Sequence, residues 1–270
     1  DLGRFDEAIT NCRQALSLQP DFAEAHNNLG NALQGNGAYE DAMASYRQAI
    51  ALMPDFAEAY SNLGNALKDQ GQLEEALGNY KRVLEIDPEN AKAHFNLGIL
   101  QLLSGNFEEG WPNYDWRWRV KDFVSHESNI IHKESLWHGE TLKGPDGKKI
   151  LVSMEQGIGD EIMFASMIPD LAQVADEIVV ECEARLVPLF KRSFPTITFI
   201  VRSDAPLDDA TEDEIDFQIP AGNLGSHFRR NFDQFPKPAS YLLPDAKKKG
   251  HIRNDYSDRW PDKRLVGISW

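Results

Sequence analysis

The sequence lacks the features that would place it in a membrane, on nucleic acid or among disulfide-stabilised proteins. Its 270 residues include two cysteines, Cys12 and Cys182, which are too few for a disulfide framework. No apolar run reaches the roughly 18 to 20 residues that a bilayer span needs, and the first residues lack the basic and apolar regions of a signal peptide. With 28 basic against 43 acidic side chains, the net charge of −15 disfavours binding to phosphate backbones. These absences predict a cytoplasmic protein without a membrane span or a nucleic-acid partner.

Sequence motifs for metal and common cofactor chemistry are also missing. There is no CxxC, no HExxH, no Ser/His/Asp order, no GxxxxGK[ST] and no GxGxxG in a dinucleotide-binding context. His126, His132 and His138 are spaced by six residues, which fits no metal signature, and they are expected on the surface. The small basic groups Lys247 to Lys249 and Arg229 with Arg230 are predicted to be solvated. We therefore expect no metal ion and no bound cofactor in this chain.

The residues that are present are distributed unevenly. A content of 41% hydrophobic and 26% charged residues is typical of a soluble globular protein, and the length allows two domains. Residues 1 to 110 carry 7 basic and 17 acidic side chains, a net charge of −10, whereas residues 111 to 270 carry 21 and 26, a net charge of −5. Two different kinds of sequence are joined, and the first would select basic or neutral partners.

The first part repeats itself every 34 residues. One unit opens at Ala23 and the next at Ala57, and leucine, glycine, alanine and proline positions recur at the same offset, as in Gly30, Gly64 and Gly98. This pattern resembles the tetratricopeptide repeat, which implies paired helices stacked in a right-handed solenoid. A glycine inside a helix costs about 1 kcal/mol relative to alanine, so a close approach of the two helices is expected there.

Other recurrent positions predict the turns and the core of each unit. Gly37, Gly71 and Gly105 suit a left-handed turn between the helices, and Pro54 and Pro88 end the second helix. The residues expected in the core of one unit recur at helical spacing, namely Leu29, Leu33, Tyr39, Ala42, Tyr46 and Ala49. Residues 1 to 22 form only half a unit, so the array is expected to have continued in the N-terminal direction of a parent protein.

Asparagine recurs on the first helix of each unit. Asn28, Asn62 and Asn96 are 34 residues apart, and Asn31 and Asn65 follow one helical turn later. Side-chain amides in a row can pair with the backbone of a bound peptide whatever its sequence. The units also resemble the repeats of the O-linked N-acetylglucosamine transferase family, and that resemblance implies a ladder that holds protein substrates on the concave face. Hydrogen bonds within the repeats are the alternative use of these amides.

The last repeat departs from the pattern. Gly110 replaces the usual alanine and WPNYDWRW replaces an ordinary second helix. This segment predicts an amphipathic helix with Trp111, Tyr114 and Trp118 on one face and with Arg117 and Arg119 pointing elsewhere. We expect it to seal the end of the solenoid, and a sugar-binding platform is the alternative.

After about residue 149 the pattern changes to strands that alternate with helices. KILVSME, EIVVECE, TITFIVR and IDFQIPA are short apolar segments, and the helical segments QGIGDEIMFASMIPDLAQVA and RLVPLFKRSF lie between the first three. This order predicts a parallel Rossmann-like α/β sheet whose ligands bind at the carboxyl ends of the strands. An acidic loop, SDAPLDDATEDE, is expected before the fourth strand.

The segment ILVSMEQGIGDEIMFASMIPDL resembles the opening of the heptosyltransferase-like, family 9-like glycosyltransferases, and EQGxGD after a repeat array is similar to bacterial proteins that fuse the two parts. The resemblance implies the N-terminal half of a GT-B fold. It also implies that Asp160 is the base that deprotonates the acceptor hydroxyl. Glu155 and Gln156 would contact the acceptor, and Gly157 and Gly159 would let the backbone approach the substrate. The alternative for Asp160 is a capping acid in the first turn of a helix.

These patterns predict four segments. They are a repeat array over 1–118, a linker over 119–148, the Rossmann-like domain over 149–264 and the start of a second such domain over 265–270. Because the resemblance places the nucleotide-sugar donor in that second domain, the parent is expected to transfer a sugar while this part is inactive. The competing hypothesis is a non-catalytic protein-interaction scaffold with a degenerate domain. The cut solenoid end and the final strand also suggest self-association.

Overall fold

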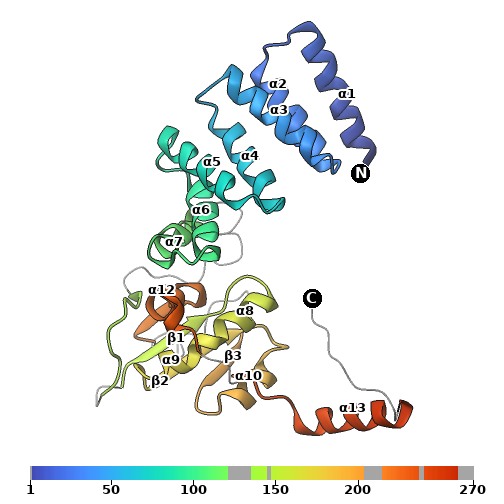
Figure 1. Cartoon of the computed structure of the whole chain (residues 1–270). Helices are drawn as coiled ribbons and strands as arrows, with labels where there is room; N and C mark the ends of the chain where they lie inside the picture. Colours follow the sequence, from blue (N-terminus) through green and yellow to red (C-terminus); the bar gives the residue numbers. More distant parts are fainter. Residues whose placement is uncertain (1, 121–134, 145–146, 204–214, 237–239, 261–270) are drawn as a thin grey trace. The chain divides into compact units, whose positions relative to one another are not determined.

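The computed structural model describes residues 2–120, 135–144, 147–203, 215–236 and 240–260. The chain divides into two compact units, residues 1–125 and 126–270, which are described separately below. Over residues 2–120 the first unit contains helices and no strand, and the second unit contains the parallel sheet (Figure 1). The predicted acidic loop and the predicted strand RLVGISW at the chain end lie outside the described residues, as do His126 and His132.

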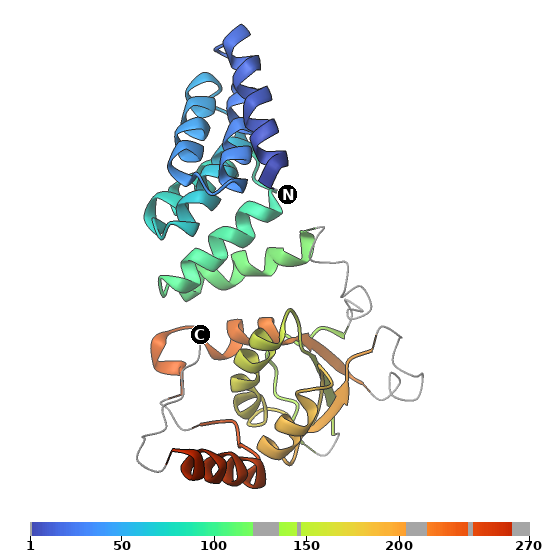
Figure 2. The same cartoon turned by 90° about the vertical axis from the view of Figure 1, so that its right-hand side faces the viewer.

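The first unit is a stack of helix pairs (Figure 2). Successive helices are antiparallel neighbours joined by short turns, as the repeat pattern predicts. Their bounds are α1 Leu2–Leu18, α2 Ala23–Gly35, α3 Tyr39–Leu52, α4 Ala57–Asp69, α5 Leu73–Ile86, α6 Ala91–Leu103 and α7 Phe107–Tyr114. A continuous apolar core runs between them and includes Leu33, Tyr46, Leu67 and Tyr80, whereas Tyr39, which the sequence places in the core, is 38% exposed.

The recurrent glycines have the two roles that the sequence predicts. Gly37, Gly71 and Gly105 have φ angles of +81°, +74° and +81°, in the left-handed region that side chains other than glycine rarely adopt. Gly64 instead makes room for a neighbour, because a Cβ atom there would lie 2.8 Å from Cε1 of Tyr80. The missing side chain therefore lets the buried tyrosine ring of α5 pack directly on α4.

The end of the solenoid corrects one prediction. Helix α7 stops at Tyr114, and Asp115–Arg119 continue as a 3₁₀ helix, so WPNYDWRW is not one amphipathic α-helix. Arg117 does not point away from the aromatic face: its side chain is fully buried, with the guanidinium carbon 4.5 Å from the ring centre of Tyr114 and 4.4 Å from that of Trp118. The tighter turn rotates Arg117 onto those rings, where a cation is attracted by their π faces.

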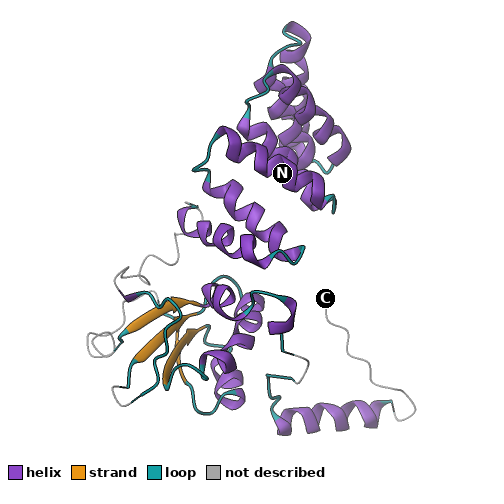
Figure 3. Ribbon diagram, turned by 60° about the vertical axis from the view of Figure 1, so that its left-hand side comes forward, coloured by secondary structure: helices purple, strands orange, loops and turns teal. Residues whose placement is uncertain are grey.

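The second unit is built on four parallel strands (Figure 3). The strands are β1 Lys149–Ser153, β2 Glu177–Cys182, β3 Thr198–Val201 and β4 Phe217–Pro220, and they correspond to the four predicted apolar segments. Their order in the sheet is β3-β2-β1-β4, with Val152 beside Val180 of β2 and Ile219 of β4. The chain thus crosses from one edge of the sheet to the other after β3, and β1 and β4 flank a topological switch point.

Helices follow the strands as far as the structure describes them. They are α8 Ile158–Phe164, η4 Ala165–Met167, α9 Ile168–Leu171, α10 Val187–Ser193, η5 Ala221–Asn223, α12 Leu224–Phe228, η6 Phe232–Gln234 and α13 Ala246–Arg259. Apolar side chains of the sheet and of α8, α9 and α10 form one core. Trp137 and Leu142, which fall in the predicted linker, are 3% exposed and belong to this core.

Arg229 corrects a second prediction. It is not solvated but 4% exposed, and its guanidinium donates to Oδ2 of Asp170 at 2.8 Å and to the carbonyl oxygen of Ser166 at 3.2 Å. A buried arginine needs such partners, since an unpaired buried charge is strongly destabilising. Lys247 to Lys249 are exposed, as the sequence predicts.

Candidate peptide-binding face and sheet-edge site

The first helix of each repeat carries four residues on one side, at positions i, i+4, i+7 and i+11. In α2 these residues are Glu24, Asn28, Asn31 and Gly35, and all four are exposed. At 100° per residue they lie within roughly 60° of one another around the helix. We call these four positions, together with their equivalents 34 and 68 residues later in α4 and α6, the amide stripe. It contains all five asparagines that the sequence singles out.

Hydrogen bonds connect the asparagines of neighbouring repeats. The amide nitrogen of Asn62 donates to Oδ1 of Asn27 at 3.0 Å, and Asn27 in turn donates to Oε1 of Glu58 at 3.0 Å. The amide nitrogen of Asn96 donates to Oδ1 of Asn65 at 3.2 Å. The first helices of adjacent units are thereby tied side chain to side chain, and these bonds orient the amides of Asn27, Asn62, Asn65 and Asn96.

Two stripe asparagines also accept hydrogen bonds from the core. The hydroxyl group of Tyr46 donates to Oδ1 of Asn31 at 2.8 Å, and that of Tyr80 donates to Oδ1 of Asn65 at 2.7 Å. Burial raises the pKa of the Tyr80 hydroxyl above its ordinary value, and the nearby carboxylate of Asp69 adds to the effect. The tyrosines therefore remain protonated donors. Asn31 and Asn65 each use an acceptor oxygen inside the repeats, and only their remaining hydrogen-bonding capacity is open to a ligand.

A second group of polar residues lies at the carboxyl ends of β1 and β4. Glu155 follows β1, is fully buried and accepts a hydrogen bond from the backbone N–H of Gly222 at 2.7 Å through Oε1. Gly222 follows β4, so this contact closes the sheet edge at the switch point. In open α/β sheets, ligands bind outside the carboxyl ends of the strands at such a switch point.

The turn after Glu155 presents the other predicted residues. Gln156 is exposed and has a φ angle of +65°, a left-handed conformation that is uncommon for a residue other than glycine. Oδ2 of Asp160 accepts a hydrogen bond from the N–H of Gly157 at 3.1 Å, so it satisfies one of the unpaired donors at the start of α8. Gly159 is exposed, and a Cβ atom there would meet nothing within 4 Å. The structure thus brings Glu155, Gln156, Gly157, Gly159 and Asp160 together at one edge.

An ion pair between a buried glutamate and a partly exposed arginine supports this turn. Glu161 in α8 is fully buried, and its Oε1 lies 2.8 Å from a guanidinium nitrogen of Arg202, which follows β3. Oε2 of Glu161 accepts from the N–H of Glu183 at 3.0 Å, and Arg202 donates to the carbonyl oxygen of Met154 at 2.7 Å. The pair therefore links α8 with the ends of three strands.

The surroundings of Glu161 change the pKa of its carboxyl group. Burial raises the pKa of Glu161 above its ordinary value, while the N–H of Glu183 and the charge of Arg202 oppose that rise. Glu181 also has a raised pKa because of burial. Burial likewise raises the pKa of the Cys182 thiol to about 12, which leaves it protonated and unreactive.

Sequence reasoning missed three residues of these sites. Asn27 occurs in one repeat only, since serine and phenylalanine occupy the equivalent positions, so a search for periodicity passes over it. Glu161 is the residue after Asp160. Arg202 is the last residue of the third apolar segment, TITFIVR. The rule that ligands gather at the carboxyl ends of parallel strands could have identified both. The described residues hold no group of three His, Cys, Asp or Glu side chains suited to a metal ion, and no helix there is long and apolar enough to span a membrane.

Comparison with known proteins identifies the repeats. A family model of the TPR repeat matches residues 1–37, 36–71 and 64–105. The chain therefore contains TPR repeats over its first 105 residues, in agreement with the helix pairs described above.

Among curated proteins, the chain is similar to Protein FlbA of Caulobacter vibrioides, with 28% identity over 146 residues. That alignment covers 50% of this chain but only 24% of FlbA, so the chain spans about a quarter of the length of this relative. Among solved structures, a crystal structure of MamA is 26% identical, with 44% of this chain and 70% of that chain covered and a TM-score of 0.41. The first TPR of Spaghetti (RPAP3), bound to the HSP90 peptide SRMEEVD, is 31% identical, with 38% and 82% covered and a TM-score of 0.37.

Proposed function

We propose that this chain is a protein-interaction scaffold whose TPR repeats hold an extended peptide along the amide stripe. The observation that carries this proposal is the alignment of the stripe by hydrogen bonds from Asn62 to Asn27 and from Asn96 to Asn65. Amides that are already oriented lose little freedom on binding, which lowers the cost of pairing with a peptide backbone. A backbone ligand suits a scaffold because it tolerates many sequences.

The stripe also has bonding capacity left for a ligand. An asparagine amide offers two donors and two acceptor lone pairs, and Asn62 and Asn96 each use one donor in the bonds between repeats. Asn28 is exposed, and the structure describes no hydrogen bond of its side chain to the rest of the described chain. Asn28 is therefore the stripe asparagine on which the proposal can be tested with least disturbance of the fold.

The test begins with phage-displayed random peptides selected on the whole chain, followed by affinity measurement with a selected peptide. Changing Asn28, Asn62 and Asn96 together to Ala should weaken binding by roughly tenfold or more, since each lost hydrogen bond is worth about 0.5–1.5 kcal/mol. Asn28→Ala alone should weaken binding without changing stability. Asn79→Ala on α5, where the amide bonds only to the carbonyl oxygen of Glu75, is the matched control. Undiminished binding by the triple variant would exclude the ladder.

The α/β unit supports a second candidate function, the acceptor-side half of a glycosyltransferase. Two observations favour it: the strand order β3-β2-β1-β4 has its switch point at Glu155, and Asp160 lies in the first turn of α8 at that edge. In this proposal Asp160 is the base for the acceptor hydroxyl and the exposed residues Gln156, Gly157 and Gly159 contact the acceptor, while the buried Glu155 holds the turn. A nucleotide sugar is donated from a further domain of the parent. The bond between Asp160 and Gly157 also fits a purely capping role.

Two substitutions at Asp160 separate the alternatives. Asp160→Asn retains an oxygen that can accept from Gly157 but removes the base, so it should preserve the stability of α8 and abolish sugar transfer by the full-length parent. Asp160→Ala should remove both the cap and the base, so it should destabilise α8 and also abolish sugar transfer. If the parent transfers sugar equally well with Asn at this position, Asp160 is a cap and nothing more.

A further inference from the structure

The composition of the amide stripe changes along the array. In α2 and α4 the equivalent positions Glu24 and Glu58 are exposed carboxylates, one turn before the first stripe asparagine. Position i+11 is Gly35 in α2 but the exposed Asp69 in α4. Helix α2 has no lysine or arginine at all, and α4 has only Lys68, outside the stripe. The stripe is therefore acidic over the first two described units.

The third unit has the opposite character. The stripe positions of α6 are Lys92, Asn96, Ile99 and Leu103, so a cation replaces the glutamate and two aliphatic residues follow the asparagine. Leu103 is 68% exposed, and Ile99, one turn before it on the stripe, is partly buried. The two aliphatic side chains give the stripe an apolar end in α6, where a large apolar side chain of a ligand would lose water-exposed surface on contact.

From this gradient we propose that the partner is an extended segment with basic side chains over α2 and α4 and a large apolar side chain over α6. This inference rests on the peptide-binding function proposed above and adds the chemistry of the peptide. Basic side chains would pair with Glu24 and Glu58 while the backbone pairs with the asparagines. The net charge of −10 over residues 1 to 110 would attract such a segment from a distance.

Geometry sets the spacing of the side chains. Packed helices lie about 8–10 Å apart, and an extended chain in the polyproline II conformation advances about 3.1 Å per residue with three residues per turn, so neighbouring first helices face ligand side chains about three positions apart. Leu103 lies eleven residues beyond Lys92, the α6 position equivalent to Glu58, so it is about 16 Å further along its helix and about 19 Å, or roughly six ligand residues, from Glu58. The expected ligand pattern is therefore basic, basic three positions later, and apolar about six positions after that. A peptide whose N-terminus lies over α2 carries this pattern from its N-terminus, and a peptide that lies in the opposite direction carries it reversed.

The probes are fluorescein-labelled peptides of the sequence Gly-Lys-Ser-Gly-Lys-Ser-Gly-Ser-Gly-Ser-Leu-Gly and of its reverse, tested by fluorescence anisotropy on the whole chain. Two further sets replace both lysines by glutamate or the leucine by serine. One of the two lysine peptides should bind at least about tenfold more tightly than its glutamate counterpart at low salt, and raising the salt to about 0.5 M should shrink this difference. Tight binding of the glutamate peptides would overturn the proposal.

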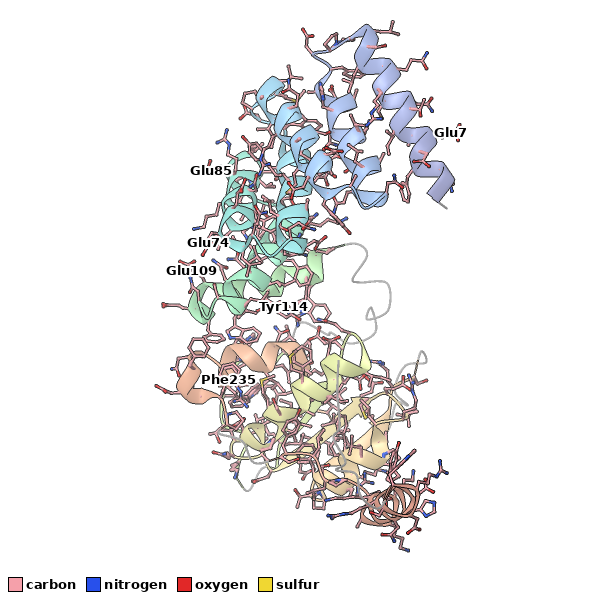
Figure 4. The ribbon with its side chains drawn as sticks, turned by 45° about the vertical axis from the view of Figure 1, so that its right-hand side comes forward. Glu7, Glu74, Glu85, Glu109, Tyr114 and Phe235 are labelled. Atoms are coloured by element: carbon pink, nitrogen blue, oxygen red, sulfur yellow. The ribbon has the colours of Figure 1, made fainter. Side chains whose placement is uncertain are left out.

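Substitutions in the protein assign the contacts. Changing Glu24 and Glu58 together to Gln should lower the affinity for the lysine peptide about fivefold, because an exposed ion pair is worth up to about 1 kcal/mol. The equivalent acids of the second helices, Glu40 and Glu74, are the matched control, and Figure 4 places Glu74 on α5. Their double change to Gln should leave affinity unchanged.

Leu103→Ser should lower the affinity for the leucine peptide by about threefold to tenfold and leave the affinity for the serine peptide unchanged. Leu18→Ser, at an 84% exposed leucine that ends α1, is its control. If either stripe variant behaves like its control, the assigned contact is wrong.

The outcomes separate this inference from the proposed function. If peptides of every composition bind equally and the Asn28, Asn62 and Asn96 variant loses them all, the ladder stands and the charge gradient is irrelevant. If neither these peptides nor any from the random library binds, both proposals fail.

Discussion

At the scale of single residues, the repeat is fixed by a glycine and a tyrosine that fit together. Gly30 and Gly64 receive the rings of Tyr46 and Tyr80, whose hydroxyl groups then reach the asparagines one residue further along the same first helix. The glycine is costly for the helix by itself, and the cost is offset by the burial of an aromatic ring. Periodicity alone predicts the close approach at Gly64 but not the hydroxyl bond, because that depends on the rotation of the ring.

We therefore predict opposite effects for two glycine-to-alanine changes. Gly64→Ala should destabilise the solenoid by about 1–3 kcal/mol, since the new Cβ would lie 2.8 Å from the Tyr80 ring. Gly78→Ala, in α5, meets nothing within 4 Å and should stabilise it by about 0.5–1 kcal/mol. Urea unfolding followed by circular dichroism measures both. A loss of stability in the Gly78 variant, or none in the Gly64 variant, would contradict this account.

At the scale of helices and strands, apolar runs predict which segments are strands, and they predict little about the polar segments. Strands β1, β2 and β4 coincide with apolar segments because residues on both of their faces are buried, whereas β3 lies at the sheet edge with Val201 exposed. Trp137 escapes prediction because its neighbours are glycines and charges, yet the ring packs into the core and its N–H bonds to the carbonyl oxygen of Glu140. Helix α13 is not predicted either, since its exposed sequence has no apolar stripe; Asp245 caps its first turn by accepting from the N–H of Lys248 at 3.0 Å.

The ion pair of Glu161 and Arg202 escaped prediction for a different reason: it joins residues from two elements, and nothing in a local pattern shows which charged residues meet. Its behaviour with pH is testable. Because burial raises the pKa of Glu161, the folded chain binds more protons than the unfolded chain above about pH 4.3, the ordinary value for glutamate. The contribution of Glu161 to stability therefore decreases as pH rises from that value through the raised pKa.

Replacing Glu161 by Gln should remove this contribution. The free energy of unfolding of the variant, measured by urea titration between about pH 4.5 and 7, should fall less steeply with rising pH than that of the wild type. Asp233→Asn, at an exposed carboxylate of η6, provides the comparison. Parallel curves for wild type and the Glu161 variant would show that this carboxyl group does not titrate differently in the folded state.

At the scale of the whole molecule, charge is the dominant feature. The net charge of −15 is concentrated in the helical repeats, where like charges repel across a thin solenoid. Composition and repeats predict this distribution and the division into two kinds of sequence. The chemistry of a binding partner is set by surfaces that form only when residues distant in the sequence meet, as Asn27 meets Asn62 and Glu58.

The repulsion predicts a salt effect on stability. Raising sodium chloride from about 10 mM to about 150 mM should increase the melting temperature of the chain by a few degrees, because the screening length falls to about 8 Å. Potassium chloride should act equally, since the effect depends on ionic strength alone. A melting temperature that is constant or falls over this range would mean that favourable ion pairs, such as Arg47 with Glu75, outweigh the repulsion.

The contacts between repeats make the array modular. Asn31 and Asn65 occupy the same place in successive units, and each accepts from the tyrosine of its own unit, whereas Asn65 also accepts from Asn96 of the next. Excising one complete period, residues 57–90, would place Asn96 opposite Asn31, which presents the same acceptor in the same setting. An array of this kind can gain or lose whole units during evolution without a new type of contact between units. The length of its binding surface can therefore change while the pattern of hydrogen bonds between units stays the same.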